Sequence, residues 1–436
     1  MVKNRKIFKI CVIGSGYVGL VAAACFSKLG NKVICVDKDR NKISSLKKGV
    51  VPNYEAGLDK LVKEGVKKKH LFFTSAVSEG VQKSDIIFIA VGTPSKDTGE
   101  ADLSAIEDVA RYIAGHLNSY KLIVEKSTVP VRTGKKIRET IKRYSKKGVE
   151  FDVASNPEFL REGRAVNDFL SPDRIVLGVE SKRAENILKA LYKPVKAPVL
   201  VTDINTAELI KHASNSFLAA KISFINSVSL ICEETGSDIE KVALGMGMDK
   251  RIGREFLDAG IGFGGSCFPK DVSAFIQIAK KAGVEFRILE EVKKVNSGQK
   301  RHFVEKIKEE LWTLKDKKIG VLGVSFKPDT DDIRDSPAVD IINMLLSEGT
   351  KIKVYDPKAV PKARKVLGGV TFCKDVYSTA KDADCIALLT EWEEFRKLDF
   401  KKLKSLMKYP FLADGRNFLD KNLMESLGFK YTGIGR

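Results

Sequence analysis

Short apolar runs alternate with amphipathic stretches of helical length over the first two hundred residues, a pattern typical of strands and crossover helices. The predicted strands are Phe8–Ile13, Lys32–Val36, Asp85–Val91, Lys121–Val124 and Phe151–Ala154, and the predicted helices are Tyr17–Leu29, Leu103–Leu117 and Thr133–Ser145. Such alternation predicts a parallel sheet covered by helices on both faces. We therefore expect a Rossmann-like domain over residues 1–203.

The pattern changes near Asp203 and becomes helical. A long segment without proline, Ala207–Thr235, is followed by shorter helices and by a helix over Arg287–Leu311. Because the long segment is apolar on much of its circumference, we expect it to be central, with a subunit contact. Residues 204–314 are predicted to form a central helical domain.

A second strand–helix–strand unit begins after the polar break at Lys315–Lys318. Its predicted strands are Lys318–Val324, Lys351–Tyr355, Ala383–Leu389 and Pro410–Ala413, with a helix over Ala338–Ser347. The predicted fold class is thus α/β, with two Rossmann-like doubly wound domains (1–203 and 315–436) joined by a long central helix.

The first predicted turn contains a dinucleotide-binding fingerprint, Gly14-Ser-Gly16-Tyr17-Val18-Gly19. It lies between a strand and a helix, where glycines permit a tight turn and close approach of a pyrophosphate. Asp37 ends the next strand, about twenty residues on, as expected of an acid that accepts hydrogen bonds from a ribose diol. These residues predict NAD as the cofactor. The carboxylate of Asp37 would repel a 2′-phosphate, so NADP is disfavoured, but it is not excluded, because Lys42 lies close by.

Polar residues follow three predicted strands at the edge of the sheet where such folds bind ligands. They are Thr93, Thr128 and Glu158. Lys211 and Asn215 are four residues apart in the long helix and therefore share one helix face. Each alone also fits a capping or surface role, but their common placement favours function.

A glycine-rich segment, Gly260–Asp271, delivers Cys267 to the start of a helix. We expect the glycines to let the backbone approach a bulky ligand. The helix N-terminus and the neighbouring Lys270 favour the thiolate, the nucleophilic form of cysteine. A glycine-rich connection with Cys267 as a packing residue is the alternative interpretation.

Composition narrows the class of protein. The net charge of +20 comes from scattered basic pairs without aromatic interleaving, so we expect no nucleic-acid function and a field that attracts anionic substrates. Five of the seven cysteines lie inside apolar runs, and the four histidines do not cluster, so neither disulfides nor a metal site is expected. No apolar run approaches the roughly 18–20 residues needed to span a bilayer. We therefore expect no membrane partner, and we expect the protein to be cytoplasmic.

With these motifs assembled, the chain resembles the nucleotide-sugar 6-dehydrogenases of the UDP-glucose/GDP-mannose dehydrogenase family over essentially its full length, and among them those that act on UDP-glucose. The motifs that carry the resemblance are Gly14–Gly19, Val91–Pro94, Lys126–Pro130, Asn156–Gly163, Lys211 with Asn215, Arg251–Gly253, Gly264–Asp271 and Phe326–Arg334. One departure is Ala56, where the family usually has proline.

The resemblance implies oxidation of C6 of the sugar to a carboxylate in two hydride steps, with Cys267 holding the intermediate as a thiohemiacetal and then a thioester. It implies catalytic roles for Lys211, Asn215, Asp271, Glu158 and Thr128. It implies cofactor contacts for Thr93, Thr128, Glu162, Lys270 and Arg334, beside the fingerprint residues Gly14, Gly16, Tyr17, Val18, Gly19, Asp37 and Lys42. It implies substrate contacts for Glu158, Phe159, Leu160, Lys211, Asn215, Phe263, Gly264, Lys327 and Arg416, and for Arg251 across the interface of a homodimer.

Three alternatives stay open. The first is the same chemistry on GDP-mannose or UDP-N-acetylmannosamine. The second is a two-electron dehydrogenase of the hydroxy-acid type, against which Cys267 and the second nucleotide domain argue. The third is a non-catalytic binding protein.

Overall fold

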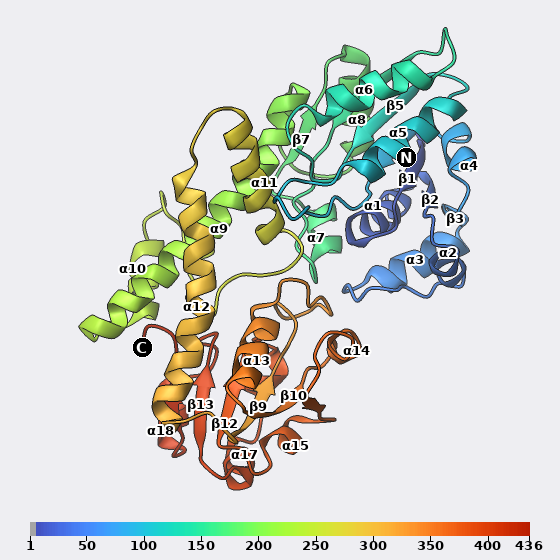
Figure 1. Cartoon of the computed structure of the whole chain (residues 1–436). Coiled ribbons are helices and arrows are strands. Elements are labelled where there is room, and N and C mark those ends of the chain that lie inside the picture. The colour runs from blue at the N-terminus through green and yellow to red at the C-terminus, as the bar shows by residue number, and fades with distance from the viewer. Residues whose placement is uncertain (1–5) are drawn as a thin grey trace. The chain divides into compact units, whose positions relative to one another are not determined.

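The computed structural model describes residues 6–436, which divide into two compact units (Figure 1). The first unit extends to Ser214 and includes Ser273–Ala282, and the second contains residues 215–272 and 283–436. Two helices, α9 (Ile204–Thr235) and α11 (Phe268–Lys281), run from one unit into the other. Each unit is built on its own sheet.

The sheet of the first unit has eight strands in the order β3-β2-β1-β4-β5-β6-β7-β8. Strands β1 to β6 are mutually parallel, whereas β7 runs antiparallel to β6. The order of the first six strands is that of a doubly wound dinucleotide-binding fold. The elements are β1 (Lys9–Ile13), α1 (Tyr17–Lys28), β2 (Lys32–Val36), α2 (Arg40–Lys47), α3 (Leu58–Lys67), β3 (Leu71–Thr74), α4 (Val77–Gln82), β4 (Ile86–Ile89), α5 (Ser104–His116), β5 (Lys121–Glu125), α6 (Thr133–Tyr144), β6 (Phe151–Ser155), α7 (Ala165–Leu170), β7 (Ile175–Gly178), α8 (Lys182–Tyr192) and β8 (Val199–Thr202).

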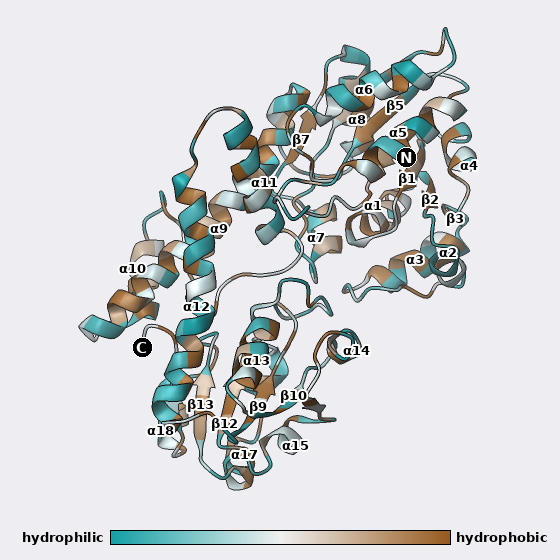
Figure 2. Ribbon diagram, in the orientation of Figure 1, coloured by the Kyte–Doolittle hydropathy of each residue, from teal (hydrophilic) through white to brown (hydrophobic). Residues whose placement is uncertain are grey.

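Both faces of this sheet are buried, which explains why its strands are continuous apolar runs rather than alternating ones. Along β1, Ile10 and Val12 join one hydrophobic core and Cys11 and Ile13 join another. Helix α1 covers the first core, and α5 and α6 cover the second. In Figure 2, β5 and β7 are brown between helices that carry polar residues on their outer sides.

The second unit contains a fully parallel six-stranded sheet in the order β11-β10-β9-β12-β13-β14, the same winding as the first six strands above. Residues of β12 alternate between two cores, Cys385 and Ala387 in one and Ile386 and Leu388 in the other. The elements are α10 (Ile239–Gly247), α12 (Arg287–Leu311), β9 (Lys318–Leu322), α13 (Pro337–Ser347), β10 (Lys351–Tyr355), α14 (Val360–Ala363), β11 (Val370–Phe372), α15 (Val376–Ala380), β12 (Cys385–Leu388), α16 (Glu393–Arg396), α17 (Phe400–Leu406), β13 (Phe411–Asp414), α18 (Lys421–Ser426) and β14 (Lys430–Thr432). The α/β class with two doubly wound sheets and a long central helix is confirmed.

Helix α9 corrects one expectation. An 18-residue window of its 32 residues has a mean hydropathy of 1.3, so by length and composition this helix could cross a membrane. Serine, asparagine and Lys221 interrupt its apolar runs, which is why the sequence shows no long uninterrupted apolar run. Within the structure 44% of that window is buried, and one such helix is weak evidence of a membrane span, because the core helix of a soluble protein passes the same test.

Candidate active site

The β1–α1 turn has the geometry of a dinucleotide site. Gly14 has φ +103°, and a Cβ there would lie within 3.0 Å of the carbonyl oxygen of Ala90. A Cβ on Gly19 would collide with the carbonyl of Gly14. At Gly16, by contrast, a Cβ would meet nothing within 4 Å. The first and third glycines are therefore needed for packing, whereas the second leaves open space over the turn, which fits a pyrophosphate.

Helix α1 begins directly after Gly16, and no side chain caps its first turn. Uncapped N–H groups at a helix N-terminus favour an anionic ligand. Asp37 at the end of β2 accepts hydrogen bonds from the backbone and the hydroxyl of Ser15 at 2.9 and 2.6 Å, and Lys42 lies 3.4 Å from its carboxylate. Partial burial raises the pKa of Asp37, but hydrogen bonds from Ser15 and Asp39 outweigh it, so the pKa is below its ordinary value. The carboxylate is thus an acceptor, as a ribose contact requires.

The carboxyl ends of β4, β5 and β6 bring predicted residues together within the first unit. Thr93 is buried and donates a hydrogen bond to the backbone oxygen of Thr128 at 2.9 Å. Glu158 and Lys211 are both buried and form an ion pair of 2.9 Å. The second carboxylate oxygen of Glu158 accepts from the backbone of Leu160 at 2.6 Å. Glu158 and Lys211 therefore form a buried acid–base pair at the ligand-binding edge.

The loop that follows Glu158 is held at several points. The ring of Phe159 lies 3.9 Å from the guanidinium carbon of Arg174 and 5.4 Å from the Lys211 nitrogen. The carboxylate of Glu55 accepts hydrogen bonds from the backbone of Gly163 and Ala165 at the start of α7. Glu162 lies half-buried in this loop. Sequence reasoning missed the role of Glu55, which is more than a hundred residues from the loop in sequence.

In the second unit, Cys267 is half-exposed and directly precedes α11. Its backbone oxygen accepts from the backbone of Asp271 at 2.8 Å, so the thiol sits at the helix N-terminus as expected. The buried carboxylate of Asp271 accepts from the Asn215 amide at 2.6 Å and pairs with Lys270 at 2.7 Å. Asn215 is thus hydrogen-bonded to Asp271, whereas Lys211 is ion-paired with Glu158.

The glycines before Cys267 overturn one expectation. A Cβ on Gly264 would lie within 3.0 Å of the backbone oxygen of Asp335, and one on Gly265 would meet the ring of Phe326. Gly260 and Gly262 are similarly crowded. Their absent side chains make room for the protein's own backbone and rings, not for an incoming ligand.

Two asparagines that sequence reasoning missed hold this loop. Asn296 of α12 accepts from the backbone of Phe263 at 2.8 Å and donates to its oxygen at 3.0 Å. Asn226 of α9 is fully buried and accepts from the backbone of Gly260 at 2.9 Å. Asparagine is a poor residue for a helix interior, so its placement there is the available sequence signal. The thiol therefore stands on a restrained loop.

The remaining predicted residues of the second unit lie on three segments. The guanidinium of Arg416, after β13, donates to the backbone oxygens of Leu389, Gly262 and Phe326 at 2.9 to 3.2 Å, so this side chain ties the cysteine loop to the ends of the sheet. Lys327 is half-buried beside Phe326. Arg334 forms a bidentate pair with Asp332, and Arg251 is exposed and paired with Asp249. Their ligand roles stay predictions.

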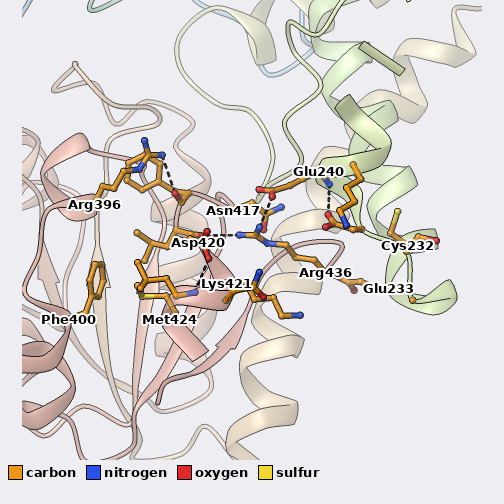
Figure 3. Close-up of a pocket in the computed structure, with 18 residues that line it drawn as sticks. Cys232, Glu233, Glu240, Arg396, Phe400, Asn417, Asp420, Lys421, Met424 and Arg436 are labelled. Carbon is orange, nitrogen blue, oxygen red and sulfur yellow. Dashed lines mark hydrogen bonds and ion pairs between the residues drawn. The ribbon is translucent and has the colours of Figure 1, made fainter. Parts of the chain in front are cut away.

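A cavity of about 900 Å³ lies elsewhere in the second unit and includes none of the predicted residues. Figure 3 shows Arg436 among Glu240, Asn417 and Asp420 in this pocket. Within residues 6–436, no three His, Cys, Asp or Glu side chains form a group able to hold a metal ion. The five cysteines of the apolar runs are buried as expected, and Cys373 is the other half-exposed cysteine.

These features define a dehydrogenase-type protein with a dinucleotide turn in one unit and a poised cysteine beside a second nucleotide-type sheet in the other. Comparison with known proteins gives the family. The model of the NAD binding domain of the UDP-glucose/GDP-mannose dehydrogenase family matches residues 8–196, that of the central domain residues 205–298, and that of the UDP binding domain residues 320–421. The chain belongs to the UDP-glucose/GDP-mannose dehydrogenase family.

Individual relatives are similar over nearly the whole chain. UDP-glucose 6-dehydrogenase TuaD of Bacillus subtilis (strain 168) is 50% identical, with 98% of this chain and 93% of the relative covered. UDP-glucose 6-dehydrogenase of Rhizobium meliloti (strain 1021) is 46% identical over 98% of this chain and 99% of its own. A UDP-glucose dehydrogenase structure from Pyrobaculum islandicum superposes with a TM-score of 0.93 at 38% identity and covers 100% of this chain and 99% of its own.

Proposed function

We propose that this protein oxidises UDP-glucose at C6 to UDP-glucuronate, with reduction of two NAD+ per sugar. The observation that carries the proposal is Cys267, half-exposed at the start of α11 with the buried Asp271–Asn215 pair one helical turn on. Support comes from family membership and from relatives named UDP-glucose 6-dehydrogenase at 44–50% identity. NAD+, which residues Gly14–Gly19 and Asp37 would hold, accepts a hydride in each oxidation.

Residues of the chain carry out the other steps of the proposed reaction. The alcohol loses its hydroxyl proton and a hydride to become an aldehyde, and Lys211 stabilises the alkoxide on the way. The Cys267 thiolate then adds to the aldehyde carbon to give a thiohemiacetal, which loses a proton and a second hydride to become a thioester. Water cleaves the thioester to the carboxylate and regenerates the thiol, with Glu158 and Asp271 able to orient that water. The sum consumes one water and two NAD+ and releases two NADH and three protons.

The thiol explains why both oxidations occur on one protein. A thiohemiacetal keeps the aldehyde covalently attached until the second hydride leaves, whereas a free aldehyde would diffuse away. The proposal requires the cofactor and the thiol to act on the same carbon in turn. GDP-mannose and UDP-N-acetylmannosamine remain alternative substrates for this chemistry.

Counting NADH tests the proposal directly. The protein is mixed with excess NAD+ and limiting UDP-glucose, GDP-mannose or UDP-N-acetylmannosamine, and NADH absorbance is followed to completion. We expect two NADH per UDP-glucose and little turnover of the other two sugars. Cys267→Ser should lower kcat on the order of 10³-fold or more, while Cys373→Ser, the control for a half-exposed cysteine, should leave it unchanged. One NADH per sugar, or an active Cys267→Ser, would contradict the thioester route.

We also propose a cytoplasmic homodimer in which Arg251 reaches the substrate of the neighbouring subunit. In support, Phe217, Phe224 and Ile231 repeat every seven residues along α9 and are each more than half exposed, a stripe that a second copy could cover. Mixing inactive Arg251→Ala with inactive Cys267→Ser should restore activity, because a mixed dimer contains one intact site. No recovery on mixing would argue that Arg251 acts within its own subunit.

A further inference from the structure

Lys126, at the carboxyl end of β5, is a buried lysine that the proposed chemistry does not use. Its side chain is only 4% exposed. Its ammonium group donates to the side-chain oxygen of Asn156 at 3.0 Å and lies 3.3 Å from the backbone oxygen of the same residue. Lysine is almost never fully buried unless it is paired, because desolvation of the charge is costly. Its presence here therefore calls for a role.

Stability does not supply that role. Desolvation lowers the pKa of Lys126 to about 8, which means that the folded protein disfavours the charge it carries. An apolar side chain of similar length would avoid this cost. The ring of Phe169, 5.9 Å from the ammonium, offers only a weak compensating contact.

What Lys126 does is fix Asn156. The Asn156 amide donates to the backbone oxygen of Val176 at 2.9 Å, and its side-chain oxygen also accepts from the hydroxyl of Tyr192 at 2.5 Å. Its backbone N–H donates to the backbone oxygen of Glu125 at 2.8 Å. Every polar group of Asn156 is thus bonded to Lys126, β5, β7 or α8, and these bonds fix the residue at the end of β6.

Asn156 lies two residues before Glu158 in the chain. Only Pro157 separates the two residues, and the fixed φ of proline passes the orientation of Asn156 on to the next residue. Glu158 is held against Lys211 at 2.9 Å. We propose that Lys126 is a positioning residue for nucleotide-sugar oxidation, because it holds Asn156 and through it sets Glu158 against Lys211. This inference rests on the proposed function.

Variants of Lys126 test the inference, with a matched control on the same strand. Lys121, at the other end of β5, is also a buried lysine, and its ammonium group donates to the backbone oxygen of Ser84 at 2.6 Å. We expect Lys126→Met to lower kcat about 10- to 100-fold, the scale of a displaced catalytic group, with KM for NAD+ and the melting temperature changed no more than in Lys121→Met. Lys126→Arg should recover most of kcat, because a cavity of about 280 Å³ beside Lys126 gives the longer side chain room.

A double-mutant cycle distinguishes positioning from general destabilisation. If Lys126 acts through Glu158, then Lys126→Met combined with Glu158→Gln should be no slower than Glu158→Gln alone. Tyr192→Phe removes the hydrogen bond from the Tyr192 hydroxyl to the side-chain oxygen of Asn156 and should show the same non-additivity with Glu158→Gln. The inference can therefore be tested even if Lys126→Met does not fold. Additive losses, or an unchanged kcat in Lys126→Met, would overturn the inference.

The outcome for the proposed function is read separately, from the wild-type protein. Two NADH per sugar together with additive losses would leave the function standing and reject the role of Lys126. A wild-type protein that oxidises none of the three nucleotide sugars would reject the function, and the positioning role would fall with it.

Discussion

Substitution of two glycines in the β1–α1 turn should separate cofactor binding from folding. Gly16 has φ −71° and ψ −169°, which any residue adopts, and a Cβ there meets nothing within 4 Å. Gly16→Ala therefore introduces no strain and reduces the entropy of the unfolded chain. Gly16 is also the N-cap of α1, where glycine is preferred to alanine, so the two effects offset each other and we expect the stability of the cofactor-free protein to change by less than about 1 kcal/mol, a shift in Tm of at most roughly 4 °C.

Gly14→Ala should destabilise the fold strongly. Its φ of +103° costs an alanine about 1–3 kcal/mol, and overpacking against Ala90 adds about 1–3 kcal/mol. The sum, about 2–6 kcal/mol, is a large share of the roughly 5–15 kcal/mol that stabilises a typical protein. Gly14→Ala should melt roughly 5–20 °C lower than the wild-type protein, or not fold.

The assay measures Tm without cofactor and the Kd for NADH by fluorescence. If the open space over Gly16 is where the pyrophosphate binds, its alanine variant should bind NADH at least about 10-fold more weakly, a loss of about 1.4 kcal/mol, although its Tm is nearly unchanged. Gly115→Ala is the control, because Gly115 lies in α5 and a Cβ there also meets nothing. It should raise Tm without changing Kd. A Gly16→Ala protein with wild-type affinity would refute the assignment of this space to the pyrophosphate.

Two further predictions concern a buried acid and the cysteine loop. Burial raises the pKa of Glu208 to about 7, so its contribution to stability is full below about pH 4.5 and is lost as the pH rises through about 7. The free energy of unfolding of the wild-type protein relative to Glu208→Gln should therefore fall between pH 4.5 and 8, by up to about 3 kcal/mol, and a difference that stays constant with pH would contradict the burial argument. Asn296→Ala strips both bonds from Phe263 and should cost about 1–3 kcal/mol of stability, with a further loss of kcat because the Cys267 loop loosens. Asn31→Ala, which removes two comparable backbone bonds in the first unit, should lose stability but not kcat, and equal kcat in the two variants would argue against loop restraint.

The central part of each sheet follows from the sequence alone. The strand Lys32–Val36 and the helix Arg287–Leu311 were predicted with the bounds they have, because an apolar run closed by a charged residue and a long amphipathic period are strong local signals. The reversal at β7 was not predicted, since a four-residue strand says nothing about its direction. Peripheral elements such as α14 and β11 are too short to carry a period.

The candidate residues could be named from motifs, but not their partners. Lys211 and Asn215 share a helix face, which suggested one joint role, yet the first pairs with Glu158 and the second with Asp271. Those partners are more than fifty residues away in sequence, and no local pattern encodes which of them each side chain meets. For the same reason the Lys126–Asn156 contact was invisible, although both residues belong to recognised motifs.

The two glycine-rich segments show what the sequence could not distinguish. In the first, Gly16 is open and fits a ligand, whereas Gly264 and Gly265 before Cys267 are filled by the protein's own atoms. Both segments are rich in glycine, so the sequence alone suggests a ligand at each. Only the atoms that surround each glycine in the structure show which segment leaves open space. The consequence is chemical, because a loop packed against Asp335 and Phe326 and bonded to Asn296 holds its cysteine at a fixed place. A nucleophile that must meet an aldehyde carbon between two hydride transfers benefits more from such a restrained position than from added space, since reaction rates depend steeply on the alignment of the reacting atoms.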